Sequence, residues 1–143
     1  MKIAIRIIAS LAVLVGVIAV VGYFLPVNHE ASSSADFNKP PADVFALISD
    51  VGNYRSWWPE AEVKVAVVES IPPSTFVTRI VGETQFGGTW TWEIKPTPQG
   101  SHATITERGE VYNPIFRTLS RFVFGHTSTM ESCLAAAQTQ LSN

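Results

Sequence analysis

An uninterrupted apolar run near the start of the chain constrains its fold more than any other feature. Residues 7–25 are 19 consecutive residues without a charged side chain, and Lys2 and Arg6 precede them. As an α-helix this run would be about 28 Å long, close to the roughly 30 Å of a bilayer's hydrocarbon core. No face of such a helix is polar, which is unlike the core helix of a soluble protein. We therefore expect a transmembrane anchor within residues 1–27 and a folded domain over residues 28–143.

A cleaved signal peptide is the alternative interpretation of this run. The apolar part of a signal peptide is typically about 7–15 residues long and ends close to a small-x-small cleavage site. Here the run is longer, residues 26–30 (PVNHE) form a poor site, and Ser33 and Ala35 lie well beyond it. An uncleaved single-pass anchor in the cell membrane is favoured. The basic residues before the run predict a cytoplasmic N-terminus, with the domain periplasmic or extracellular.

The remaining chain has a composition that argues against several classes of partner. After Pro26 there are 8 basic and 12 acidic residues, a net charge of −4, with no cluster of Lys or Arg. This predicts no binding to nucleic acid. Cys133 is the single cysteine, His29, His102 and His126 lack a ligand spacing, and no Gly-rich phosphate loop occurs. We therefore expect no disulfide, no metal site and no cofactor.

Hydrophobic periodicity predicts an α+β domain. Residues 32–34 (SSS) are expected in a short tether whose far end is already strand. Proline favours a helix start at residues 40–41, and a helical turn is expected near residues 54–58. Alternating apolar residues predict strands at 62–68, 75–81, 89–95 and 102–108. A last helix opens at Pro114 and carries an apolar stripe to Leu141, with Gly125 as a candidate break.

Several motifs then resemble a known superfamily. They are residues 39–50 (KPPADVFALISD), Tyr54 with residues 57–59 (WWP), residues 86–92 (FGGTWTW), residues 106–117 (TERGEVYNPIFR) and residues 121–126 (RFVFGH). Together they resemble the membrane-anchored bacterial branch of the SRPBCC superfamily, which includes START lipid-transfer domains and polyketide cyclase/dehydrase-like proteins. The resemblance implies a helix-grip fold, in which an antiparallel sheet wraps a long C-terminal helix and encloses an apolar cavity.

The chain departs from that superfamily in its number of strands. Two strands that usually follow the Trp-Trp-Pro turn are missing, so we expect a shortened sheet of about five strands. A narrower sheet implies a more open cavity and an exposed edge capable of self-association.

Aromatic residues supply most of the candidate ligand-binding positions. The period-2 geometry of residues 89–95 turns Trp90 and Trp92 inward, toward the stripe of the last helix. The candidate ligand-binding residues are Trp58, Arg79, Trp90, Trp92, Phe116, Phe122, His126 and Met130. Plain core packing is the alternative for each tryptophan.

Three titratable residues are candidates for acid–base chemistry. Glu107 lies on the apolar face of its strand, and His126 is the single histidine in the helical stripe. Tyr112 is the third candidate, as an acid or base if the domain is a cyclase-like enzyme. Pairing with Arg79 or Arg108 is the structural alternative for Glu107, and a hydrogen-bonded core position is the alternative for His126. No nucleophile motif such as Gly-x-Ser-x-Gly is present.

These observations rank three functions. The first is a membrane-tethered domain that binds a hydrophobic or amphiphilic, lipid-like small molecule between sheet and helix. The second is a polyketide cyclase/dehydrase-like enzyme that uses Glu107 or His126 as an acid or base. The third is an interaction domain of the cell envelope.

Overall fold

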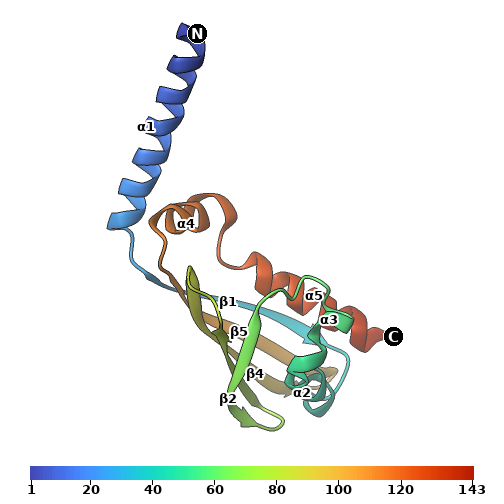
Figure 1. Ribbon diagram of the computed structural model, residues 1–143. Helices are drawn as coiled ribbons and strands as arrows, with labels where there is room; N and C mark the ends of the chain where they lie inside the picture. The colour runs from blue at the N-terminus through green and yellow to red at the C-terminus, as the bar shows by residue number, and fades with distance from the viewer.

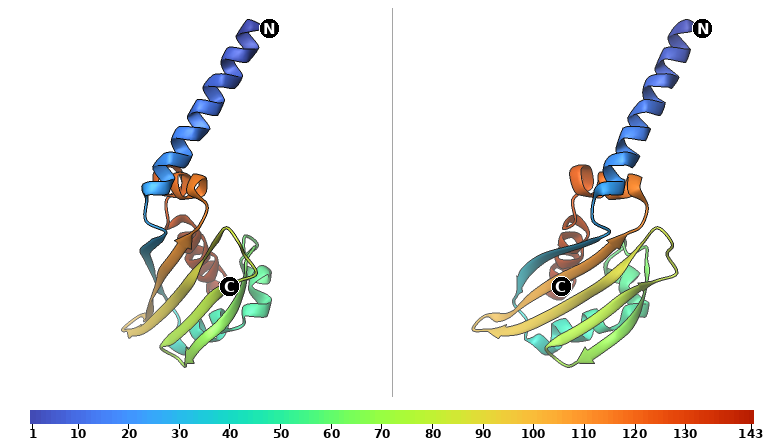
Figure 2. Two further views of the ribbon diagram at one scale, coloured as in Figure 1. Left: turned by 60° about the vertical axis from the view of Figure 1, so that its left-hand side comes forward. Right: turned by 90° about the vertical axis from the view of Figure 1, so that its left-hand side faces the viewer.

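A computed structural model describes all 143 residues, and its elements follow one another as Figure 1 shows. The chain begins with helix α1 (Lys2–Phe24), which projects away from the rest of the protein (Figures 1 and 2). The domain then consists of β1 (Asn28–Phe37), α2 (Pro41–Ser49), the 3-10 turn η1 (Val51–Asn53), α3 (Tyr54–Trp57), β2 (Lys64–Ile71), β3 (Thr75–Val81), β4 (Phe86–Thr97), β5 (Gly100–Val111), α4 (Pro114–Leu119), the π-helical turn η2 (Ser120–Phe124) and α5 (Ser128–Ser142).

The five strands form one antiparallel sheet in the order β1-β5-β4-β3-β2. This confirms the α+β class and the five-strand count. Side chains alternate across the sheet as predicted, since Trp92 and Ile94 of β4 are buried while Glu93 and Lys95 are exposed. The inner face packs against α2 and α5 in one continuous core of sixteen buried residues. Strand β2 is left as an edge, and self-association through it stays a prediction.

Strand β1 is longer than the sequence indicated. The three serines predicted in a tether lie within it, and β1 pairs with β5 without a bulge from Asn28 to Phe37. Small residues such as Ala31, Ser33 and Ala35 alternate inward, and the ladder to β5 satisfies the backbone of a segment with few apolar side chains. The consequence is that His29 belongs to the sheet and not to a linker.

The C-terminal segment is interrupted at the glycine that the sequence singled out. Gly125 has φ 73°, a left-handed conformation that favours glycine, and it separates α4 and η2 from α5. The side chain of Asn113 begins α4 by accepting hydrogen bonds from the backbone N–H groups of Ile115 (2.9 Å) and Phe116 (3.3 Å). The predicted continuous stripe is therefore split, because the π-helical turn and the break change the rotation per residue.

Helix α1 is fastened to α4 at its C-terminal end. The guanidinium of Arg117 donates to the carbonyl oxygens of Gly22 (2.8 Å) and Leu25 (3.2 Å). The same side chain also donates to the carbonyls of Val111 and Tyr112, both at 2.9 Å. These bonds satisfy carbonyls that a helix end leaves without partners, so α1 leaves the domain from a fixed position.

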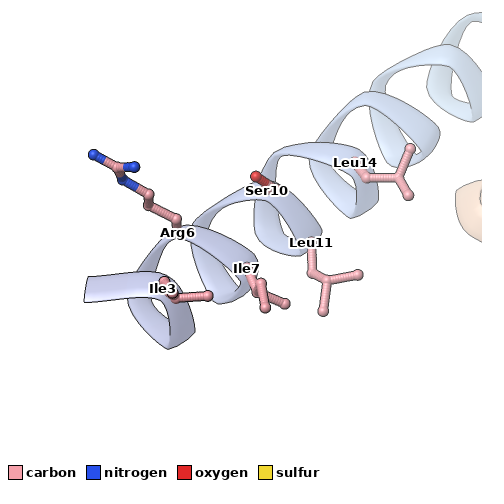
Figure 3. Close-up of a pocket in the computed structure, with 6 residues that line it drawn as sticks. All are labelled: Ile3, Arg6, Ile7, Ser10, Leu11 and Leu14. Carbon is pink, nitrogen blue, oxygen red and sulfur yellow. The ribbon is translucent and has the colours of Figure 1, made fainter. Parts of the chain in front are cut away.

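The rest of α1 stands free of the domain. It is long and apolar enough to cross a membrane, and none of its most apolar stretch is buried against the protein. Figure 3 shows side chains of its first turns, where a hollow of about 440 Å³ is bounded by Ile3, Arg6, Ile7, Ser10, Leu11 and Leu14. All six residues belong to α1 itself, so this hollow is the outer surface of one helix and has no second wall.

Candidate functional site

A cavity of about 630 Å³ lies between the sheet and the C-terminal segment. Its volume falls within the roughly 300–1,000 Å³ of small-molecule sites, and thirteen of its twenty-five lining residues are hydrophobic. The sheet wall includes Val65, Thr78, Ile80, Phe86, Trp90, Trp92, Glu107 and Val111, and the opposite wall includes Phe116, Ser120, Phe124, His126, Thr129 and Cys133. The cavity is thus the space that a helix-grip arrangement leaves between its two layers.

A polar cluster interrupts this apolar lining, and the carboxylate of Glu107 is its centre. Trp90 Nε1 donates to Glu107 Oε2 at 2.5 Å, and His29 Nε2 lies 2.7 Å from Glu107 Oε1. An ionised carboxylate can only accept, so both partners supply an N–H. The side chains of His29 and Glu107 are 15% and 19% exposed. The carboxylate therefore has two donors but keeps free lone pairs that can accept from a bound molecule.

The sheet register explains how these residues meet. Trp90 of β4 is directly opposite Glu107 of β5, and Ala31 of β1 is opposite Glu107 on its other side. His29 precedes Ala31 by two residues and so points to the same face. Three adjacent strands thus bring an imidazole, a carboxylate and an indole together.

His126 completes the cluster from the opposite wall. Its ring stacks on that of His29, with centroids 3.8 Å apart and planes 21° from parallel. Burial, followed by the charge of neighbouring His29, lowers the pKa of His126, while Glu107 acts in the opposite direction. His126 makes no hydrogen bond within the protein, so its ring nitrogens are free to bind a polar group in the cavity.

Stacked indoles form the neighbouring wall. The rings of Trp58 and Trp90 lie 5.9 Å apart and 25° from parallel, and Trp58 Nε1 donates to Ser132 Oγ at 3.1 Å. Ser132 in turn donates to the carboxylate of Glu60. These bonds hold the indole planes in place, so the cavity offers a rigid aromatic surface to an apolar group.

Tyr54 and Cys133 are further titratable side chains in the cavity lining. The Tyr54 hydroxyl donates to the carbonyl of Ile48 at 2.5 Å, and Cys133 is buried in the core. Burial raises the pKa of both groups above their usual ranges. Both are therefore neutral near pH 7, and the acidic groups of the lining are Glu107 together with Glu60, Glu62 and Glu110.

Comparison with known proteins identifies the architecture. No family model and no curated protein matches the sequence. A protein from Mesorhizobium loti superposes with a TM-score of 0.64 at 13% identity, over 80% of this chain and 97% of that chain. A START superfamily protein from Mycobacterium smegmatis superposes with a TM-score of 0.62 at 15% identity, over 80% and 97%. This protein has a START-like helix-grip fold.

An aromatase/cyclase shares the same architecture. The di-domain protein StfQ, from the steffimycin biosynthetic pathway, superposes with a TM-score of 0.62 at 10% identity, over 81% of this chain and 52% of that chain. At these identities the similarity concerns the fold alone, which hosts unrelated functions. The function of this START-like domain has to be argued from its own cavity.

The START-like domain brings most of the sequence-predicted site residues together. Five of the eight candidate ligand-binding residues line the cavity, together with the acid–base candidate Glu107: Trp58, Trp90, Trp92, Phe116 and His126. Trp92 is only 2% exposed and belongs to the core as well, so it is both a wall and a packing residue.

Four candidates lie outside the cavity. Arg79 projects from the outer face of β3, because Phe76 and Thr78 set the inward phase of that strand. Met130 is fully buried in the core, whereas Phe122 is exposed on η2, where the helical stripe is broken. Tyr112 is exposed and donates to the carboxylate of Glu110, a bond that raises the pKa of its hydroxyl.

The partners of Glu107 differ from the expected ones. Neither Arg79 nor Arg108 pairs with it, and Arg108 instead donates to Glu30 at 3.2 Å. Its main partner, His29, was not predicted, because it precedes residues 32–34, which were expected in a short tether with strand only at its far end. The signal that could have found it is the alternation of residues 29, 31, 33, 35 and 37 on one face of a strand.

Proposed function

We propose that this protein is a membrane-tethered binding module for a hydrophobic or amphiphilic small molecule with one compact polar group. The cavity supports this proposal by its apolar and aromatic walls and by the polar cluster of His29, Glu107 and His126, which lies between them. Apolar walls supply affinity through burial, and a few convergent polar groups fix orientation. A hydroxyl would suit the cluster, since it can donate to Glu107 and accept from a histidine.

The helix α1 supports the tethered part of this proposal. Its length and apolarity fit a bilayer, and Lys2 and Arg6 favour a cytoplasmic N-terminus with the domain on the other side of the membrane. A tethered domain stays within reach of molecules that dissolve in the bilayer. This makes a lipid-like ligand the natural class.

Energy transfer from tryptophan to a neutral apolar fluorophore tests the binding function. All four tryptophans lie in the domain and three of them line the cavity, so transfer to N-phenyl-1-naphthylamine bound there is a saturable signal above the non-saturating contribution of probe dissolved in the bilayer. The full chain in lipid nanodiscs should show saturable transfer. Val65→Phe, which narrows the cavity, should weaken binding about tenfold, the effect of roughly 1.4 kcal/mol.

Val68→Phe is the matched control, because Val68 is on the same strand but exposed and outside the cavity. It should bind as the unmodified protein does. Equal binding by both variants, or transfer that never saturates, would contradict a binding cavity.

An acid–base enzyme is the second candidate, and the contact between His29 and Glu107 favours it. A histidine–carboxylate pair beside a second, neutral histidine can move a proton to and from a bound carbonyl compound. Polyketide-like aromatic carbonyl compounds offered as substrates test this role. A turnover that Glu107→Gln lowers by more than about a hundredfold would favour the enzyme over the binding module.

A further inference from the structure

Three consecutive apolar residues are exposed where the domain meets α1. Phe122, Val123 and Phe124 of η2 are 65%, 66% and 64% exposed, and nearby Phe116 of α4 is 48% exposed. Single apolar residues on a surface need no explanation, but a contiguous patch of large ones indicates a surface that another apolar phase covers.

The position of this patch is fixed relative to α1. Thr118 Oγ1 donates to the carbonyl of Ile18 at 2.7 Å, and the backbone of Pro114 packs so closely on Gly22 that no Cβ would fit there. Figures 1 and 2 show α4 beside the C-terminal end of α1, with the segment that leads to α5 at the same end of the domain.

These contacts determine how deep α4 would lie in a bilayer that α1 spans. From Ile18 to Leu25 is seven residues, or about 10 Å of helix. An α1 that spans a bilayer therefore holds α4 beside its last two turns, within the headgroup and upper acyl region. Interfacial amphipathic segments bury their apolar face about 5–10 Å into this region.

The charges and aromatic residues nearby agree with such a location. Residues 112–130 contain Arg117 and Arg121 but no acidic residue, although the chain beyond Pro26 has a net charge of −4. Tyr23, at the end of α1, is an exposed aromatic residue of the kind enriched at membrane interfaces, and Phe24 beside it is also exposed. An exposed arginine on a patch without carboxylates suits phosphate headgroups.

We propose that α4 and η2 form a second membrane contact, an interfacial platform that inserts Phe122 and Val123 into the same leaflet from which α1 emerges. This inference rests on the proposed membrane tether. The occupant is a phospholipid bilayer, because the bonds and packing of α4 on α1 hold the adjoining patch at the bilayer surface.

At the platform, the cavity would open toward the lipid leaflet. Phe116, Ser120, Phe124 and His126 line the cavity at this end, and both phenylalanines are substantially exposed. They form a rim between the cavity and the leaflet. An amphiphile can then pass from the leaflet into the cavity with its apolar part never crossing water, which removes the largest barrier to its extraction.

Site-specific fluorescence quenching tests the platform. Val123→Cys in the full chain is labelled with the fluorophore NBD and reconstituted in vesicles of phosphatidylcholine and phosphatidylglycerol. The vesicles contain a fraction of lipid with a nitroxide on the acyl chain, placed high on the chain in one set of vesicles and near its end in another. The native Cys133 is buried with a raised pKa, so it should not compete for the label. We expect loss of NBD emission with nitroxide lipid and little quenching by aqueous iodide.

Two matched labels make every outcome decisive. Val68→Cys, on the far edge strand β2, should be quenched by iodide only, and Val17→Cys, within α1, should be quenched by nitroxide lipid only. Quenching at position 17 without quenching at position 123 would contradict the platform and leave the tether intact. No lipid quenching at position 17 would contradict the tether, and the platform with it.

Discussion

Gly109 on β5 is directly opposite His29, and its missing side chain makes room for the imidazole. A Cβ at this position would lie 2.2 Å from the nearest atom of the His29 ring. Gly109→Ala should therefore displace His29 from Glu107 and leave the carboxylate with one donor. We expect binding of N-phenyl-1-naphthylamine to weaken several-fold, because the cavity wall changes shape.

The control for this prediction is Gly52→Ala, since a Cβ there meets no atom within 4 Å. It should leave binding unchanged. A Gly109→Ala protein that binds the probe like its parent would show that the position of His29 does not affect the cavity.

His126 gives the protein a specific response to pH. Its lowered pKa in the folded state means that the unfolded chain binds more protons as pH falls through about 6.5. Stability should therefore decrease across that window and level off below the folded-state pKa. Urea unfolding between about pH 5 and 8 should show this loss in the parent and a smaller loss in His126→Gln.

His102→Gln is the comparison variant, because His102 contacts Asp36 on the exposed side of the sheet. It should keep the decrease that His126→Gln loses. Identical pH profiles for the parent and His126→Gln would contradict the assigned shift.

Among the individual residues of the candidate site, the sequence predicted the positions of some and not of others. Strand alternation placed Glu107 and Trp90 on the inner face, since period-2 geometry is local. It could not choose the partner of Glu107, because that depends on which strand lies beside β5. The pairing of β1 with β5 brings His29 next to Glu107, from which it is 78 residues away in the sequence.

The elements show the same division between local and distant causes. The strand at residues 75–81 and the helix after Pro40 were predicted closely, because apolar periodicity and proline act within a few residues. The docking of α4 on α1 was not predicted, since Arg117 and Thr118 bond to backbone carbonyls of α1 and Pro114 packs on Gly22, and backbone carbonyls carry no sequence signal.

Arg117 should determine how firmly α4 holds α1. Its guanidinium donates to four carbonyl oxygens of two segments, residues 22–25 and 111–112, and Arg117→Leu removes these donors, although the Gly22 carbonyl keeps the backbone N–H of Leu25. Each buried polar group left unsatisfied costs about 1–3 kcal/mol. Hydrogen exchange in residues 112–119 of the full chain should therefore accelerate, by about tenfold or more.

Arg79→Leu is the matched variant for this prediction, because Arg79 is exposed on β3 and outside the junction. Exchange in residues 112–119 should not change in it. Unchanged exchange in Arg117→Leu would mean that packing of Pro114 on Gly22 holds the junction without the arginine.

For the whole molecule, the junction of α1 and α4 couples the orientation of α1 to the orientation of the cavity, so the proposed membrane tether would orient both. If only the short segment between α1 and β1 joined them, the domain could rotate relative to α1. The hydrogen bonds from Arg117 to the carbonyls of Gly22 and Leu25 are a second attachment that prevents this. If α1 is a membrane anchor, this junction therefore also predicts which end of the domain faces the lipid.

The sequence also predicts the orientation of α1 across the membrane. Lys2 and Arg6 are the only charges before the apolar run, and the first acidic residue is Glu30, so the positive-inside rule places the C-terminus outside the cytoplasm. A tag after Asn143 should be removed by protease added to intact spheroplasts. Lys2→Glu combined with Arg6→Glu should protect part of the population by inverting it, whereas Lys39→Glu, in the domain, should not. Complete protection of the tag in the unmodified protein would reverse the topology, and extraction of the full chain by alkaline carbonate would exclude the anchor.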